Sequence, residues 1–357
     1  MMEFSRRRLL KTGLQTGGIV GTALLTGGIA GTAFPRIAAA SVADDPLYAA
    51  AKKEGALTLY WGSYEQQTME AIRDAFKAKY PGIEVNLLRQ ASQTVYTRLR
   101  MELQSGVHEC DSLGTTNLLH YTELKKIGAL APFEPADAQH IPDAFRSLDP
   151  DMMYHVGAIS LTSLSYAPGK VQAPPQSWQA LLEDQWHGKI TTGSPAFSGD
   201  VANWVVAIRR KYGDDFLRAF GKQKPKVGQS NVDTVTDILA GERMVGSGAP
   251  FSYTLTQKAA GNPIDVVAPS DDAILNLGVT GILAKAPHPN AARLFTNFLY
   301  STEVSMILQK NYWPTLRKDV AWAEGRSLEK LKWYRNTGDD LGPEVAEGIA
   351  KWKELVR

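Results

Sequence analysis

The sequence is short of cysteine, because its 357 residues include a single one, Cys110. One thiol cannot form an intramolecular disulfide, and it cannot build a metal cluster held by several cysteines. Free cysteine is among the residue types most often buried. We therefore interpret Cys110 as a buried thiol without a chemical role.

The sequence also lacks the short motifs of common enzyme chemistries. It contains no His-Glu-x-x-His pattern, no Gly-x-Gly-x-x-Gly fingerprint, and no arrangement typical of a Ser/His/Asp or Cys/His centre. His155 and His187 have no partner at metal-ligand spacing in the sequence, so we interpret both as structural or surface residues. We predict a protein that is not an enzyme, and an exported enzyme is the alternative from another class.

An excess of charge of one sign is absent as well. The formal net charge is +2, and five of the 39 basic and one of the 37 acidic residues lie in residues 1–40. The chain after Ala40 therefore carries a net charge of −2. Nucleic-acid binding would need a clustered basic face, and we predict no nucleic-acid partner.

The first 40 residues differ from the rest of the chain. Residues 5–11 read SRRRLLK, residues 12–34 form an apolar run diluted by Gly and Thr, and residues 38–40 are three alanines. This order resembles the twin-arginine export signal of bacteria, and the alternatives are a membrane anchor or a basic nucleic-acid arm. We predict a signal peptide over residues 1–40 that the Tat export machinery reads, cleavage after Ala40, and a mature protein in the periplasm.

Strand and helix patterns alternate after the signal. Residues 57–61 are β-prone, residues 64–80 repeat apolar side chains at helical spacing, and residues 83–87 are β-prone again. Gly62 and Ser63 form a turn and a helix N-cap between the first two elements. This βαβ order predicts an α/β fold with a parallel sheet.

Two later segments, residues 158–166 and 275–283, have the pattern of strands that cross between two lobes. A cleft between lobes is a preferred place for small ligands. We predict two lobes with a ligand cleft between them, made of residues 41–155 with 275–357 and of residues 156–274.

The C-terminal segment carries two apolar patterns at helical spacing. They comprise Trp322, Leu328, Leu331 and Trp333, and then Val345, Ile349 and Trp352. We predict two amphipathic helices that cover a lobe. Nothing in the pattern indicates self-association, so we predict a monomer.

Three stretches, in the same order along the chain, resemble one protein family. They read LTLYWGSYEQQTMEAIRDAFKAKYPGIEV (57–85), PQSWQALLEDQWHGKI (175–190) and HPNAARLFTNFLYSTEVSMILQKNYWPTLRKDV (288–320). The chain resembles the extracellular solute-binding proteins of bacterial ABC importers, in the ferric-iron-binding group. The resemblance implies a type II periplasmic-binding-protein fold, each lobe a mixed sheet flanked by helices. It also implies closure over a ligand and delivery to an ABC permease in the inner membrane.

Ferric members of this family hold iron with a His and a Glu, or extra tyrosines in their place, plus two adjacent tyrosines, and anionic oxygen donors suit a hard cation. Here Tyr64 matches the His, Thr116 matches the Glu, and Phe251-Ser252 matches the tyrosine pair, with Tyr253 directly after. A Phe and a Ser cannot supply two phenolates, so only Tyr64 and Tyr253 would serve as iron ligands. We predict no resident metal or cofactor, and Fe³⁺ is the alternative cargo.

The resemblance also implies an anion site. The family binds an anion at a Ser-Gly turn that opens a helix of the second lobe, where Ser198-Gly199-Asp200 stands here, and Asn231 matches a further contact. Helix N-termini favour anions, although for any single Ser or Thr a plain N-cap is the simpler interpretation, and the family match favours Ser198, Gly199 and Asn231 as site residues. We predict a small anionic solute: a phosphonate, a phosphate ester or a carboxylate. The predicted ligand-binding residues are Trp61, Ser63, Tyr64, Thr115, Thr116, Ser198, Gly199, Asp200, Asn231, Phe251, Ser252 and Tyr253.

Overall fold

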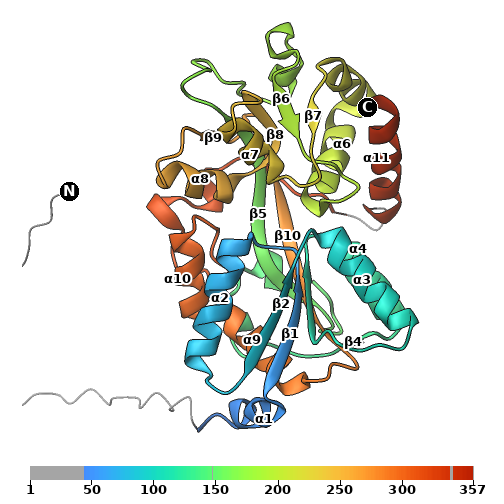
Figure 1. Ribbon diagram of the computed structural model, residues 1–357, viewed down its shortest axis with the longest axis vertical. Helices are drawn as coiled ribbons and strands as arrows, with labels where there is room; N and C mark the ends of the chain where they lie inside the picture. The colour runs from blue at the N-terminus through green and yellow to red at the C-terminus, as the bar shows by residue number, and fades with distance from the viewer. Residues whose placement is uncertain (1–43, 147, 338–340, 357) are drawn as a thin grey trace, which may run out of the picture. The chain divides into compact units, whose positions relative to one another are not determined.

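The computed structural model describes residues 44–146, 148–337 and 341–356 (Figure 1). The predicted signal peptide and its cleavage point lie outside these residues. Within the described ranges, none of the helices combines the length and the apolar character that a membrane crossing requires.

The described strands form one mixed sheet. The main strand order is β2-β1-β3-β10-β5-β8-β6-β7, with β4 and β11 added on β10 and β9 added on β5. The strands are β1 (Ala56–Trp61), β2 (Glu84–Arg89), β3 (Ser112–Thr115), β4 (Leu130–Ala131), β5 (His155–Tyr166), β6 (Ile190–Thr192), β7 (Lys226–Val227), β8 (Val245–Pro250), β9 (Asp265–Val267), β10 (Ala273–Leu283) and β11 (Trp333–Tyr334).

Helices flank this sheet on both faces (Figure 1). They are α1 (Pro46–Glu54), α2 (Gln66–Lys79), α3 (Ser92–Gln104), α4 (Leu118–Lys126), α5 (Asp143–Arg146), α6 (Gly199–Lys222), α7 (Asp233–Leu239), α8 (Phe251–Ala259), α9 (Pro289–Leu299), α10 (Thr302–Lys310) and α11 (Leu341–Leu355). The predicted α/β fold class is therefore confirmed, with the strands joined by hydrogen bonds into a single sheet.

The predicted βαβ unit is confirmed as β1, α2 and β2, and the two strands pair in parallel. The predicted N-cap is wrong, because α2 begins at Gln66 and its N-cap position is Glu65, not Ser63. Glu65 still has an extended backbone (φ −66°, ψ 161°), so the chain enters the helix two residues later than predicted. The hydroxyl of Ser63 is therefore left without a capping role.

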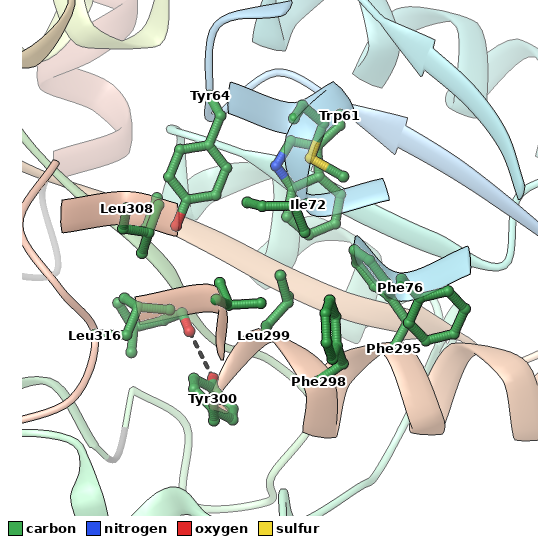
Figure 2. Packing of buried hydrophobic residues seen from close by; sticks show 14 of the residues in the cluster. Trp61, Tyr64, Ile72, Phe76, Phe295, Phe298, Leu299, Tyr300, Leu308 and Leu316 are labelled. Carbon is green, nitrogen blue, oxygen red and sulfur yellow. Dashed lines mark hydrogen bonds between the residues drawn. The ribbon is translucent and has the colours of Figure 1, made fainter. Parts of the chain in front are cut away.

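The side chains of strand β1 alternate between the two faces of the sheet, and both faces are buried. Leu57, Leu59 and Trp61 pack into the core below α2 and α9, whereas Tyr60 packs into a second core that also contains Cys110. Figure 2 shows the first core, where the Trp61 ring meets Phe295 edge to face at 5.6 Å. Cys110 is 2% exposed, so the interpretation of a buried thiol is confirmed.

Strands β5 and β10 are the long central strands of the sheet (Figure 1). They pair antiparallel with each other; β10 also pairs with β3, and β5 with β8. They match the two crossing strands of the prediction, although each is longer than predicted. Because they are hydrogen-bonded, they join the elements on the β1 side to those on the β8 side.

The C-terminal segment agrees with the prediction only in part. Instead of a helix, residues 322–333 form two 3-10 turns, Ala323–Gly325 and Leu328–Lys330, and β11 then pairs with the start of β10. Trp322 turns back to donate its Nε1 hydrogen to the carbonyl oxygen of Tyr312 (2.7 Å), which favours compact turns over a regular helix. The second predicted helix is present as α11.

Helix α11 packs along α6, where Trp352 lies edge to face against Trp204 at 5.9 Å. Since α6 belongs to the predicted second lobe, we propose that residues 341–356 move with that lobe. The other predicted lobe boundaries stay predictions.

Candidate ligand-binding cleft

A cleft lies where β1 and β2 end and where α6 and α8 begin. Its cavity volume is about 30 Å³, so the cleft is narrow in this structure. The lining residues are Gly62, Ser63, Tyr64, Glu65, Arg89, Ser160, Leu161, Asp200, Asn231, Val232, Pro250, Phe251, Ser252 and Trp313.

The sheet topology explains why these segments meet. Because β1 and β2 are parallel, their carboxyl ends lie at one edge, where ligands of α/β proteins usually bind. Residues 62–65 follow β1 directly, and Arg89 is the last residue of β2. The turn after β1 needs glycine at position 62, since a Cβ there would come within 2.8 Å of the Ser92 backbone.

Three helices of eight residues or more begin at the cleft. They are α2, α6 and α8, and their first turns contribute Glu65 at the N-cap, Asp200, and Phe251 with Ser252. A helix N-terminus carries a partial positive charge and free backbone N–H groups. The cleft therefore has three sources of positive potential besides its charged side chains.

Several polar side-chain atoms of the lining are buried without a hydrogen-bond partner among the described residues. They are the hydroxyl oxygens of Ser63, Ser160 and Ser252 and the Oδ1 atom of Asp200. The three serines are 5%, 7% and 3% exposed, respectively. Buried polar atoms normally find a partner, so four unpaired atoms around one cavity indicate a place for a polar ligand.

Glu65 is the deepest acidic group of the cleft, with 8% of its surface exposed. Its Oε2 atom accepts hydrogen bonds from Trp313 Nε1 (2.9 Å) and from the Thr68 hydroxyl (3.4 Å). Burial raises the pKa of Glu65 to about 7, although these hydrogen bonds and the nearby charge of Arg89 act in the opposite direction.

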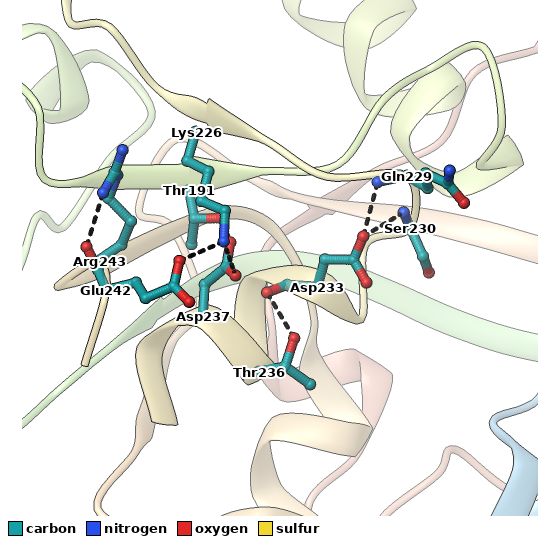
Figure 3. A network of polar contacts seen from close by, with 9 residues as sticks. All are labelled: Thr191, Lys226, Gln229, Ser230, Asp233, Thr236, Asp237, Glu242 and Arg243. Atoms are coloured by element: carbon teal, nitrogen blue, oxygen red, sulfur yellow. Dashed lines mark hydrogen bonds and ion pairs between the residues drawn. The ribbon is translucent and has the colours of Figure 1, made fainter. Parts of the chain in front are cut away.

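Asp200 lies in the first turn of α6 and accepts a hydrogen bond from Asn231 Nδ2 (3.1 Å). Burial raises the pKa of Asp200 to about 6, against the opposing effects of hydrogen bonds from Asn231, Thr116 and Ser160 and of the Arg89 charge. The loop that carries Asn231 is fixed by Asp233, whose Oδ2 accepts from the N–H groups of Gln229 (2.7 Å) and Ser230 (3.0 Å; Figure 3).

Arg89 supplies the positive side chain of the cleft lining. Its Nε donates to the carbonyl oxygen of Tyr64 (2.6 Å), which orients the guanidinium. The charges of Glu65 and Asp200 act on it, yet among the described ion pairs Arg89 takes part in none. Burial lowers the pKa of Arg89, but a guanidinium stays charged in proteins. The terminal nitrogens are thus available to a ligand.

The structure brings half of the predicted site residues into the cleft lining. These are Ser63, Tyr64, Asp200, Asn231, Phe251 and Ser252. The other six, Trp61, Thr115, Thr116, Ser198, Gly199 and Tyr253, are outside the lining.

Three of those six have structural contacts that explain their positions. Trp61 faces the core because side chains alternate along β1. The Thr115 hydroxyl lies 3.1 Å from His120 Nδ1. The Ser198 hydroxyl accepts from the Val201 N–H group (3.4 Å), so Ser198 is the N-cap of α6.

Thr116 and Gly199 touch each other beside the cleft, since a Cβ on Gly199 would lie 2.5 Å from the Thr116 hydroxyl. Asn203 also donates from Nδ2 to the Thr116 carbonyl oxygen (3.3 Å). The start of α6 and the residue that follows β3 are therefore in direct contact in this structure.

The two tyrosines considered for iron have other surroundings. The Tyr64 hydroxyl donates to the carbonyl oxygen of Gly157 (2.7 Å), its ring meets Trp313 edge to face at 4.8 Å, and it lies in the core of Figure 2. Burial raises its pKa well above the usual value, so it is a neutral phenol. Tyr253 packs against the cluster of Val235 and Ile264.

Four polar lining residues were not predicted: Glu65, Arg89, Ser160 and Trp313. Arg89 had a usable signal, because it ends a strand that is parallel to β1. Trp313 lies in the third stretch of the family resemblance, without any sign that its Nε1 would point to Glu65. Ser160 is one of several serines and threonines in β5, and the sequence does not distinguish it.

The family can now be stated. A model of the family described as bacterial extracellular solute-binding protein matches residues 71–326, which is more than half of the chain. The chain belongs to this family, and the resemblance to the solute-binding proteins of bacterial ABC importers is confirmed.

Two relatives show how far the similarity extends. A protein of Salmonella typhimurium, provisionally named a 2-aminoethylphosphonate-binding periplasmic protein, is 24% identical over 301 residues, which covers 79% of this chain and 86% of that protein. An uncharacterized protein of Haemophilus influenzae is 21% identical over 293 residues, covering 79% and 80% of the two chains.

Solved structures share the fold at low sequence identity. AfuA of Actinobacillus pleuropneumoniae, with exogenous fructose-6-phosphate bound, has a TM-score of 0.76 at 19% identity and covers 84% of this chain and 98% of its own. Iron-bound HitA of Pseudomonas aeruginosa has a TM-score of 0.71 at 21% identity and covers 84% and 99%. These neighbours establish the fold. Because they bind different ligands, the fold does not identify the solute of this chain, which has to be inferred from the residues of its own cleft.

Proposed function

We propose that the protein captures a small anionic solute in this cleft and delivers it to an ABC permease of the inner membrane. The observation that carries the proposal is the guanidinium of Arg89, which lines the cleft without an ion-pair partner among the described residues. The proposed process is binding without bond making, as in the solute-binding family to which the chain belongs.

The anionic group of the solute would lie between Arg89 and the unpaired hydroxyls of Ser63 and Ser252. Charged hydrogen bonds from a guanidinium and the N-termini of α2 and α8 would hold a phosphonate, phosphate ester or carboxylate. Relatives and neighbours with such cargo support this class, since one is named for an aminophosphonate and another holds a sugar phosphate.

The remaining steps of the proposal concern the protein's route. We propose that residues 1–40 act as a twin-arginine signal removed after Ala40, that the protein works as a monomer in the periplasm, and that its lobes close over the solute. The periplasmic names of the relatives support the location. Hinge closure is the usual switching mode of such proteins.

Ferric iron is the alternative that an experiment must separate, because HitA holds iron on the same fold. The hydroxyl of Tyr64, one of the two tyrosines considered for iron, donates to the carbonyl oxygen of Gly157, and burial keeps it a neutral phenol. This observation favours the anionic solute.

Calorimetry of the mature protein with inorganic phosphate, an alkylphosphonate, an aminoalkylphosphonate, a sugar phosphate, a carboxylate and Fe³⁺ tests the proposal. We expect binding to at least one anion, and a loss of about 30-fold in Arg89→Gln, since a hydrogen bond to a charged group contributes about 2 kcal/mol. The control is Arg218→Gln, whose side chain is 56% exposed on α6. Binding of Fe³⁺ alone, or unchanged anion affinity in Arg89→Gln, would overturn the proposal.

A further inference from the structure

The charges of the cleft do not balance, and this bears on the kind of anion that it accepts. Two carboxylates, Glu65 and Asp200, and one guanidinium, Arg89, line the cavity. Arg89 makes no ion pair with either carboxylate in the described part of the chain. With both carboxyl groups ionised, a solute that brought only an anionic group would leave three negative groups sharing one cation in a cavity with a largely buried lining, which is costly.

Asp200 has one carboxylate oxygen without a donor at hydrogen-bond distance. Its Oδ2 atom accepts from Asn231 Nδ2 (3.1 Å), whereas Oδ1 is buried and has no such donor among the described residues, although the nearby hydroxyls of Thr116 and Ser160 lower the pKa of Asp200. A carboxylate oxygen only accepts hydrogen bonds when it is ionised. The missing partner is therefore a hydrogen-bond donor, and a cationic donor would also compensate the charge.

Three buried hydroxyls without partners at hydrogen-bond distance lie around the same cavity, and those of Ser63 and Ser252 point to a polar occupant independently of the carboxylates, since the Ser160 hydroxyl lies near Asp200. They belong to Ser63 of the β1–α2 turn, Ser160 of β5 and Ser252 of α8. Each hydroxyl can donate to an anion and accept from an amine. The lining can thus receive both ends of a small zwitterion without a metal.

We propose that the solute carries a protonated amino group as well as its anionic group, and that Asp200 and Glu65 receive the amino group while Arg89 receives the anion. The class comprises aminophosphonates, amino acids and phosphorylated amines. This inference rests on the proposed function and deepens it. Asp200 is the primary receptor because one of its oxygens is free, and Glu65, already held by Trp313, is the secondary one.

The test uses matched pairs of probes in calorimetry with the mature protein. One pair is 2-aminoethylphosphonate and ethylphosphonate, and the other is β-alanine and propionate. The variants are Asp200→Asn and Glu65→Gln, which keep the size of each side chain, and the control is Asp215→Asn, whose side chain is 97% exposed. Thermal unfolding of each variant reports whether it is folded.

For at least one pair, we expect the amine-bearing probe to bind the wild type at least about 100-fold more tightly than its amine-free partner, because the amine-free probe supplies no charged donor to Asp200. Asp200→Asn should reduce this preference to below about tenfold, and it should also strengthen binding of the amine-free probe because a repulsive charge is removed. A merely structural role of Asp200 would weaken both probes together.

The two proposals fail in different ways. Equal or tighter binding of the amine-free probes, or an unchanged preference in Asp200→Asn, would overturn the zwitterion inference while leaving the Arg89-dependent anion site intact. The same holds if an amine-free sugar phosphate binds and neither amine-bearing probe does. Binding of no anionic probe at all, or of Fe³⁺ alone, would overturn the proposed function and the inference with it.

Discussion

Two polar regions of this protein contain similar side chains but differ in how these are paired. At β6, β7 and α7, Asp237 accepts hydrogen bonds from Thr191 (2.6 Å) and Lys226, which also contacts Glu242 (Figure 3). In the cleft, the hydroxyls of Ser63, Ser160 and Ser252 and one oxygen of Asp200 are unpaired.

The comparison teaches how to separate a structural polar cluster from a ligand site. Paired groups such as Thr191 and Asp237 have already satisfied their hydrogen bonds, so their removal should lower stability. Unpaired hydroxyls such as those of Ser63 and Ser252 contribute little to the free energy of unfolding, and they can form hydrogen bonds with a bound ligand. The two regions should therefore respond in opposite ways to mutation.

The largest expected effect is a pH dependence caused by Glu65. Its pKa in the folded protein is about 7 against an ordinary value of 4.5, mainly because of burial. The folded state thus holds this proton more tightly, and the free energy of unfolding should fall as pH rises from about 4.5 to about 7, by on the order of 3 kcal/mol. Urea unfolding of the ligand-free protein across this range measures the decrease.

Glu65→Gln should remove this part of the pH dependence and raise stability above pH 7, since no buried charge remains. Asp200, with a pKa of about 6 against 3.8, contributes a further decrease over its own range. The neighbouring charge of Arg89 is unchanged in this range. Glu329→Gln, at an exposed position, is the control. Parallel pH profiles for wild type and Glu65→Gln would show that Glu65 is not desolvated in the folded state.

The next effect concerns the paired region. Asp237 is 8% exposed and serves two donors, so Asp237→Ala should lower the free energy of unfolding by about 2 kcal/mol by leaving them unpaired. Solute affinity should stay within about twofold, because Asp237 is outside the cleft lining. A loss of affinity without a loss of stability would contradict the distinction between the regions.

The smallest effect on stability is expected in the cleft. Ser63→Ala and Ser252→Ala should each change the free energy of unfolding by less than about 0.5 kcal/mol, because the removed hydroxyls have no protein partner. Each should weaken solute binding by about tenfold, because one hydroxyl hydrogen bond contributes about 1.4 kcal/mol, less than the guanidinium of Arg89. Chemical unfolding and calorimetry measure the two quantities separately.

Thr191→Val provides the opposite case for those two variants. It removes a fully buried hydroxyl that donates to Asp237, so we expect a loss of about 1 kcal/mol in stability and no change in affinity. If the serine variants lost stability like Thr191→Val, the cleft hydroxyls would have to be paired inside the protein.

Local patterns predicted the elements around the cleft better than its lining. The alternation of residues 57–61 and the helical spacing of Met69, Ile72 and Phe76 are properties of short segments, so β1 and α2 were predictable. The prediction placed Ser63 at the helix N-cap, and the error of two residues is typical of helix boundaries. The failed helix at residues 322–333 shows the limit, because pairing of β11 with β10 prevailed over an apolar pattern.

Site prediction depended on distance along the chain. Asn231 and Asp200 were found because the family resemblance pointed to helix starts, and their mutual hydrogen bond confirms only that they are neighbours. Glu65 and Trp313 were missed because their mutual hydrogen bond joins segments far apart in sequence, whereas Arg89 was missed although its place at the end of β2 was a usable signal.

The sequence by itself determined the α/β class, the buried Cys110 and the membership of the solute-binding family, because periodicity, composition and motifs are local properties. Only the tertiary structure decided which polar atoms are paired. Whether Asp200 has a free oxygen, or whether Arg89 is without an ion-pair partner, depends on β2, α6 and α7 meeting at one edge. Pairing is a property of three-dimensional proximity, and in this protein it distinguishes the candidate site from the rest of the polar interior.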